Sequence, residues 1–323
     1  MIKINTRTSI VELTALLNKH NILFVNERLL NIAKAGEGNM NMVLRIKTNL
    51  RSFIFKQSRS YVQKYQDIPA PIERIDVEYN FYKTIINIEN REHFPEIIYY
   101  SKKDFFMIIE DLGITKDFSS IYKKRKIDKK TITNLTKILK DIHSCKFEMN
   151  YPSNVELKNL NHQHIFVLPF IKENGFSLNS IQQGLENLAL PFINNELLRN
   201  KSLTLGDQYL KRGSTLLHGD FYPGSWMQMD NEIFIIDPEF SFIGDLEFDI
   251  GVFIAHIIIT TLKEEYLNDI IDDYSKSVDK ELVKYYTAIE VIRRIIGLAQ
   301  LPLNLSLDEK EKLLNFSKTL LLN

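Results

Sequence analysis

The sequence predicts an α+β protein of two lobes, with an antiparallel sheet in the first and mainly helices in the second. Residues 42–56 alternate apolar and polar side chains in two runs, as strands do, whereas residues 129–145 carry apolar side chains at helical spacing. A brief acidic connector, Glu110-Asp111-Leu112-Gly113, separates the two patterns. We therefore divide the chain into residues 1–109, a connector at 110–113 and residues 114–323.

In the first lobe we expect strands at 42–47 and 52–56, joined by a polar turn, and another strand at 105–109. A helix is expected at 72–88, because large side chains recur there on one stripe. The stripe consists of Ile75, Tyr79, Tyr82 and Ile86.

In the second lobe the apolar spacing predicts helices at 129–145, 249–268 and 280–299, the last two closing the chain. Short apolar runs at 214–218 and 233–237 predict two strands, separated by a polar turn at Asp230-Asn231. Residues 150–200 give no clear pattern, and we predict no element there.

The composition narrows the class of protein. Lys plus Arg and Asp plus Glu each number 41, so the formal net charge is zero and nothing points to a nucleic-acid or membrane partner. A homodimer is left open.

The single Cys145 excludes an intramolecular disulfide and is expected to be a half-buried helix residue. The N-terminus lacks the apolar core of a signal peptide, and the apolar stretch at 250–262 falls short of the ~20 residues that span a bilayer. We expect a cytoplasmic protein.

Acidic side chains follow two of the predicted strands. Asp220 lies in Leu217-His218-Gly219-Asp220-Phe221-Tyr222-Pro223-Gly224-Ser225, while Asp237 and Glu239 lie in Ile236-Asp237-Pro238-Glu239-Phe240. Asp220 is placed to accept a proton from an attacking hydroxyl, and the other two offer oxygen ligands to Mg²⁺. Either aspartate alone could be a turn or cap residue. The two motifs together favour the catalytic interpretation.

Three weaker signals lie in the first lobe. Gly36-Glu37-Gly38-Asn39-Met40-Asn41 precedes a strand and could bring backbone N–H groups to phosphate, although two glycines are more often an ordinary turn. Lys56 ends an apolar strand, and Glu78 follows at a separation that suits an ion pair holding ATP phosphates. In the second lobe, His162 and His164 resemble a zinc pair only superficially.

These motifs together resemble the aminoglycoside-phosphotransferase and choline-kinase-like superfamily, and most closely the 5-methylthioribose kinases. HGDFYPGS is similar to the family's catalytic loop, and IIDPEFSFIGDLEFDIG to its metal motif and the segment after it. GEGNMNMV, FIFKQS, RIDVEYNFY and IIEDLG are similar to the phosphate loop, strand lysine, helix glutamate and hinge. IRRIIGLA resembles the twin-arginine segment. The matches run in order from about residue 36 to 300.

The resemblance implies a protein-kinase-like fold and an ATP- and Mg²⁺-dependent kinase for a small-molecule hydroxyl, with 5-methylthioribose as the best single acceptor. It assigns Asp220 as the catalytic base and directs Arg293 and Arg294 toward the sugar or the phosphoryl group. The implied ATP contacts are Gly36, Gly38, Asn39, Lys56 and Glu78, with backbone groups of Glu110, Asp111 and Leu112 at the adenine. The implied metal ligands are Asp237, Glu239 and Ser225.

The sequence also departs from the family pattern. Ser225 stands where most of the superfamily has a metal-binding asparagine, although the methylthioribose kinases also show serine. Residues 61–71 lack the family's tryptophan, and the segment between Asp249 and Arg293 is shorter than usual. These regions shape the acceptor pocket. An aminoglycoside, a choline-like amine or another metabolite therefore remains an alternative acceptor, and a catalytically silent nucleotide-binding scaffold is the alternative outside enzymes.

Overall fold

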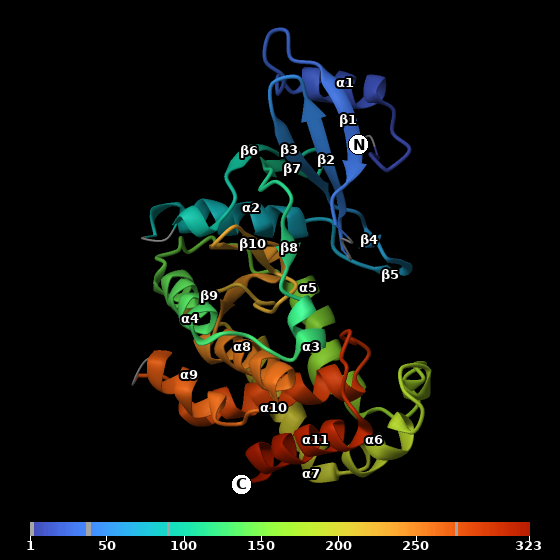
Figure 1. Ribbon diagram of the computed structural model, residues 1–323, viewed down its shortest axis with the longest axis vertical. Coiled ribbons are helices and arrows are strands. Elements are labelled where there is room, and N and C mark those ends of the chain that lie inside the picture. The colour runs from blue at the N-terminus through green and yellow to red at the C-terminus, as the bar shows by residue number, and fades with distance from the viewer. Residues whose placement is uncertain (1–2, 37–39, 89–90, 275–276) are drawn as a thin grey trace.

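The computed structural model describes residues 3–36, 40–88, 91–274 and 277–323. A five-stranded sheet lies at one end of the molecule and helices fill the other (Figure 1). Every neighbouring pair in this sheet is antiparallel. The strand order is β1 (Leu29–Lys34), β2 (Met42–Thr48), β3 (Ser52–Gln57), β7 (Phe106–Glu110) and β6 (Ile97–Ser101).

The sheet buries one face against α1 (Ile10–Lys19). Alternate residues of β2 and β3 point into this small core, as the two-residue period of a strand requires. Ser9 begins α1 with a capping box: the Ser9 hydroxyl accepts a hydrogen bond from the backbone N–H of Glu12, and the Glu12 carboxylate accepts one from the backbone N–H of Ser9. The buried contacts comprise Leu13, Leu16, Leu17, Leu44, Ile46, Phe53 and Phe55.

Helix α2 (Arg74–Thr84) crosses between the sheet and the helical lobe (Figure 1). The small hairpin of β4 (Tyr61–Val62) and β5 (Tyr65–Pro69) precedes it. Two charged side chains of α2, Arg74 and Glu78, are completely buried. Charged groups are fully buried only where they find partners, so α2 carries polar contacts between the lobes.

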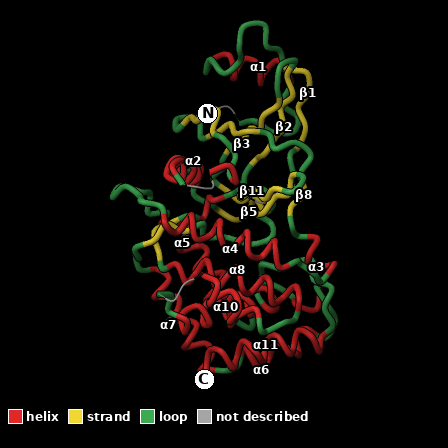
Figure 2. The backbone as a smooth tube through the Cα atoms, turned by 60° about the vertical axis from the view of Figure 1, so that its left-hand side comes forward, coloured by secondary structure: helices red, strands yellow, loops and turns green. Residues whose placement is uncertain are grey.

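The second lobe is built around α8 (Leu246–Thr261) and α10 (Lys280–Ile296), which pack against each other (Figure 2). Nearly every residue of α8 is buried, as its continuous apolar sequence requires. No helix in the described ranges is long and apolar enough to cross a membrane. The surrounding helices are α3 (Ser120–Lys124), α4 (Lys129–Ser144), α5 (Val155–His162), α6 (Leu185–Ile193), α7 (Glu196–Leu210), α9 (Tyr266–Tyr274) and α11 (Leu307–Leu322).

Short strands sit where this lobe meets the sheet. β9 (Thr215–Leu217) pairs with β12 (Phe242–Gly244), and β10 (Trp226–Met229) pairs with both β11 (Glu232–Ile235) and β8 (Lys116–Asp117). The expected turn at Asp230-Asn231 lies between β9 and β11, as predicted. It joins β11 directly to β10, a strand that the sequence did not predict.

Two expectations for the C-terminal helices were wrong. The helix predicted at 249–268 ends at Thr261, because Leu262 adopts a left-handed conformation (φ 58°) and polar residues follow it. The helix at 280–296 also does not close the chain. Ser306 begins α11 with a second capping box, and α11 packs along α10. The segment at 150–200, for which no element was predicted, forms α5, α6, part of α7 and a π-helical turn at Gln163–Val167.

Candidate active site

The loop after β9 is fixed by one buried carboxylate. Asp249, in the first turn of α8, accepts the backbone N–H groups of His218 (2.7 Å) and Gly219 (3.0 Å). Gly219 has φ +83°, and a Cβ there would lie 2.1 Å from the Phe240 carbonyl oxygen, so only glycine fits. His218 Nε2 lies 3.0 Å from the Ile236 carbonyl oxygen, and its Nδ1 accepts the Asp220 N–H (3.3 Å), so the imidazole ring braces the loop.

Ser225 closes the same loop. Its hydroxyl points at the carbonyl oxygens of Tyr222 (2.8 Å) and Asp220 (3.0 Å), and its oxygen accepts the Tyr222 N–H (3.2 Å). Ser225 is almost fully buried. These bonds hold the loop closed, and the part of Ser225 as a metal ligand stays a prediction.

Asp220 stands at the tip of this loop with its side chain 23% exposed. Burial raises the pKa of Asp220 to about 6, while the positive charges of Arg294 and Arg293 act in the opposite direction. A carboxylate with this pKa is ionised at neutral pH and still basic enough to orient a hydroxyl and share its proton.

Lys56 joins the two lobes through carboxylates. Its ammonium lies 2.7 Å from Glu78 on α2 and 2.5 Å from Asp237, which follows β11. Burial disfavours the charged ammonium, but Asp237, Glu78 and Glu239 outweigh it and raise the pKa of Lys56. Burial raises the pKa of Glu78 to about 7 against the attraction of Lys56. Lys56 is thus held as a cation, and the side chain of Asp237 stays about half exposed.

Glu239 has partners that the sequence did not reveal. Its Oε2 accepts a hydrogen bond from Asn41 Nδ2 (2.8 Å) and lies 3.2 Å from Arg74 Nε, which also donates to Asn41 Oδ1 (2.9 Å). Arg74 stands one helical turn before Glu78, and that spacing is the only signal in the sequence that could have placed it here. Asn41 thus connects the segment before β2 to the opposite lobe.

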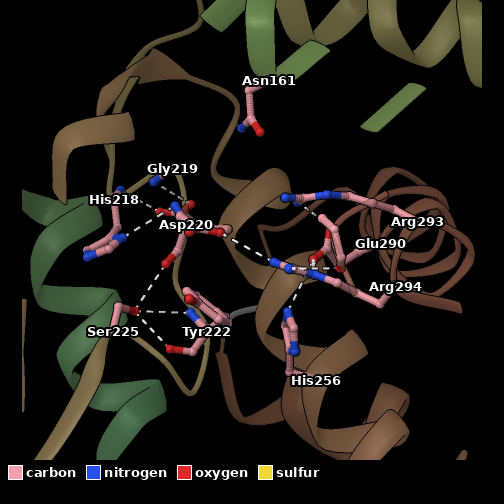
Figure 3. A network of polar contacts seen from close by, with 12 residues as sticks. Asn161, His218, Gly219, Asp220, Tyr222, Ser225, His256, Glu290, Arg293 and Arg294 are labelled. Carbon is pink, nitrogen blue, oxygen red and sulfur yellow. Dashed lines mark hydrogen bonds and ion pairs between the residues drawn. The ribbon is translucent and has the colours of Figure 1, made fainter. Parts of the chain in front are cut away.

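The two arginines of α10 enter the same region from the other side (Figure 3). Arg294 Nη2 lies 3.6 Å from Asp220 Oδ1, and its guanidinium lies 5.1 Å from the centre of the Tyr222 ring. Arg293 and Arg294 are both buried and both contact Glu290. Arg294 is therefore the member of the pair that faces Asp220.

Of the other predicted ATP contacts, Gly36 has φ +71°, a conformation that favours glycine, whereas Gly38 and Asn39 lie outside the described residues. In the connector, Asp111 pairs with Arg45 (3.0 Å) and accepts the Gly113 N–H (3.0 Å). The backbone N–H of Glu110 donates to the carbonyl oxygen of Glu96 (2.8 Å), and Leu112 is buried.

Asp237 and Glu239 offer what a phosphate-bound Mg²⁺ requires. Such an ion is held by one or two carboxylates together with phosphate and water oxygens. Burial and, in smaller part, the nearby charge of Asp237 raise the pKa of Glu239, against Lys56 and Arg74. Within the described ranges no group of three or more His, Cys, Asp or Glu side chains forms a metal cage. The pair fits an ion shared with a nucleotide better than a metal centre made by protein alone.

Comparison with known proteins agrees with this geometry. Residues 32–286 match the phosphotransferase enzyme family. A Bacillus velezensis protein named methylthioribose kinase is 27% identical over 265 residues, which cover 75% of this chain and 64% of that protein. The similar protein of Exiguobacterium sibiricum is 27% identical over 255 residues, covering 73% and 64%. The chain thus spans just under two thirds of the length of these relatives.

A solved spectinomycin phosphotransferase, in complex with ADP and spectinomycin, shares the fold with a TM-score of 0.56 at 16% identity. The match covers 96% of this chain and 94% of that one. At this identity the likeness concerns the fold alone, and it confirms the two-lobed, protein-kinase-like class that the sequence predicted.

Proposed function

Because the chain belongs to the phosphotransferase enzyme family, we propose that it is a small-molecule kinase that transfers the γ-phosphoryl group of ATP to a hydroxyl group. One observation carries the proposal: Lys56 of the sheet lobe lies 2.5 Å from Asp237 of the helical lobe, and Glu239 lies close enough for its charge to act on both Lys56 and Asp220. We place the nucleotide between residues 1–109 and 114–323, with its adenine at the connector 110–113. Such chemistry suits a cytoplasmic protein.

The proposed reaction divides the work between the two sides of the site. Lys56, held by Glu78, binds the phosphates of ATP, and Asp237 and Glu239 would hold Mg²⁺, which offsets phosphate charge when bound. Asp220 orients the acceptor hydroxyl and takes up its proton as the oxygen attacks. Most of the rate gain then comes from positioning and electrostatic stabilisation.

The acceptor we propose is a neutral sugar, with 5-methylthioribose first. The relatives named methylthioribose kinase support this choice. The two buried guanidinium groups beside Asp220 support it as well, because they would repel a polycationic amine and can hold several sugar or phosphoryl oxygens.

ADP release in the presence of Mg²⁺ and one acceptor at a time tests the function. We expect turnover with methylthioribose, and little with kanamycin, choline or ethanolamine. Turnover with the amines alone would overturn the sugar assignment. Nucleotide binding without ADP release from any acceptor would favour a silent scaffold.

Asp220→Ala tests the base separately. Removing a general base lowers rates by about 10²–10⁴-fold, so kcat should fall by that factor while ADP still raises the melting temperature as in the wild type. Asp272→Asn is the control, because Asp272 is exposed and pairs only with Lys280 (2.7 Å) among the contacts described. Full turnover in Asp220→Ala would contradict the assignment.

A further inference from the structure

Glu290 is a buried carboxylate that lies behind Arg293 and Arg294 and has no role in the reaction proposed above. It lies on α10 one turn before the two arginines and is 1% exposed. Its carboxylate does not contact Asp220 directly, and Figure 3 shows Arg294 extending from Glu290 toward Asp220. Besides the effect of its charge on Asp220 across space, Glu290 is connected to Asp220 through Arg294.

Each carboxylate oxygen of Glu290 accepts a hydrogen bond from a different arginine. Oε1 accepts from Arg294 Nε at 2.5 Å and lies 3.1 Å from His256 Nε2, while Oε2 accepts from Arg293 Nη1 at 2.9 Å. The i, i+3 and i, i+4 spacing on one helix brings both guanidinium groups to the same carboxylate. One acidic side chain thus fixes two cations.

A second layer fixes Glu290 itself. His256 is fully buried on α8, and its Nδ1 lies 2.7 Å from the hydroxyl of Tyr122 on α3. Burial lowers the pKa of His256 to about 4, although Glu290 acts in the opposite direction, so the imidazole is neutral at pH 7. The neutral ring donates to Glu290 from Nε2 and accepts the Tyr122 proton at Nδ1. Three helices therefore determine where the Glu290 carboxylate lies.

Both arginines keep unused donors after these contacts. Among the described residues, Arg293 Nε and Arg294 Nη2 are buried without a hydrogen-bond partner, and Arg294 Nη2 is the atom 3.6 Å from Asp220. A buried guanidinium normally uses its donors. The hydrogen bond from Arg294 Nε to Glu290 thus leaves Nη2 of the same arginine available beside Asp220.

We propose that Glu290 is a positioning residue for phosphoryl transfer: it holds the guanidinium groups of Arg293 and Arg294 at the Asp220 side of the site, where they can bind the acceptor oxygen and the phosphoryl group in flight. The inference rests on the proposed kinase function. It predicts that loss of Glu290 impairs steps on the acceptor side and leaves the ATP side, built on Lys56, intact.

Removing a carboxylate from between two buried arginines could prevent folding, so Glu290 is removed together with one arginine. Glu290→Gln/Arg293→Gln keeps the net charge of the wild type, and Arg293→Gln, which retains Glu290, is its reference. Both variants keep Arg294 and differ only at Glu290. The single variant Glu290→Gln is measured beside Glu281→Gln, a change on the same helix at an exposed glutamate that pairs with Lys284 (2.6 Å).

Relative to Arg293→Gln, the double variant should show a kcat lower by at least about tenfold, in line with the loss of a positioned charge at a transition state, and an unchanged KM for ATP. Glu281→Gln should match the wild type. Two outcomes would overturn the proposal and leave Glu290 a structural residue. One is an equal kcat in the two Arg293 variants, and the other is a KM for ATP that rises in the double variant by as large a factor as kcat falls.

A crystal structure of each Arg293 variant separates failure of the inference from failure of the function. The guanidinium of Arg294 should keep its place beside Asp220 in Arg293→Gln and leave it in the double variant. An unmoved guanidinium in the double variant would refute the positioning role whatever the activity. If the wild type consumes no ATP with any acceptor, the kinase proposal fails, while this structural comparison still decides whether Glu290 positions Arg294.

Discussion

Replacing Arg294 by glutamine is expected to move the acid limb of the pH–activity profile to higher pH. Asp220 must be ionised to act, and burial raises its pKa to about 6, so activity should fall as the pH drops through that value. Arg294 opposes this rise. Without its charge the carboxylate binds a proton more readily, and the loss of activity begins at a higher pH.

The size of the shift follows from the geometry. Two unit charges 3.6 Å apart interact by about 4–5 kcal/mol at an effective dielectric constant of about 20. The partial exposure of Asp220 reduces this energy through solvent screening. If a third of it survives, the effect is about 1.4 kcal/mol, or one pKa unit. The freed charge of Glu290 acts on Asp220 in the same direction.

The assay is kcat/KM for the acceptor between pH 5 and 9, with ATP saturating, because this parameter reports groups of the enzyme before the acceptor binds. The wild-type limb should lie near pH 6 and the Arg294→Gln limb about one unit higher, at reduced maximal activity. Arg125→Gln serves as control, because Arg125 pairs with Glu309 (2.6 Å) at the surface. A limb that stays in place or moves to lower pH in Arg294→Gln would refute the reasoning, and a wild-type limb near pH 4 would remove its basis.

Two further predictions concern the residues that hold the site together. Glu78→Gln removes the charged partner of Lys56, so the KM for ATP should rise by about tenfold while the KM for the acceptor changes little; initial rates with each substrate varied in turn check this. Asp249→Asn places an amide where two backbone N–H groups, those of His218 and Gly219, need an acceptor. Unfolding free energy in denaturant titrations should fall by about 2–4 kcal/mol, and an unchanged midpoint would show that the loop is held by other contacts.

The sequence alone determined the motifs that end its strands. The expected strands at 42–47 and 52–56 match β2 and β3 closely. Successive side chains of a strand point to opposite faces, so the alternation of apolar and polar residues in the sequence is itself the pattern of a strand with one buried face. Gly219 and Asp220 were recognisable for a similar reason, since a tight turn after a buried strand constrains which residues fit. Their roles in catalysis stay predictions.

Only the tertiary structure decided which of these groups meet. Lys56 reaches Asp237 across 181 positions and Asn41 reaches Glu239 across 198, and no periodicity extends so far. Arg74 and Glu290 read in the sequence as ordinary charged residues of helices. Packing gave them buried partners, because a charge that leaves water must find an opposite charge or a hydrogen bond wherever the fold places it. Local patterns therefore name the chemical groups, and the assembly of the lobes determines what each one touches.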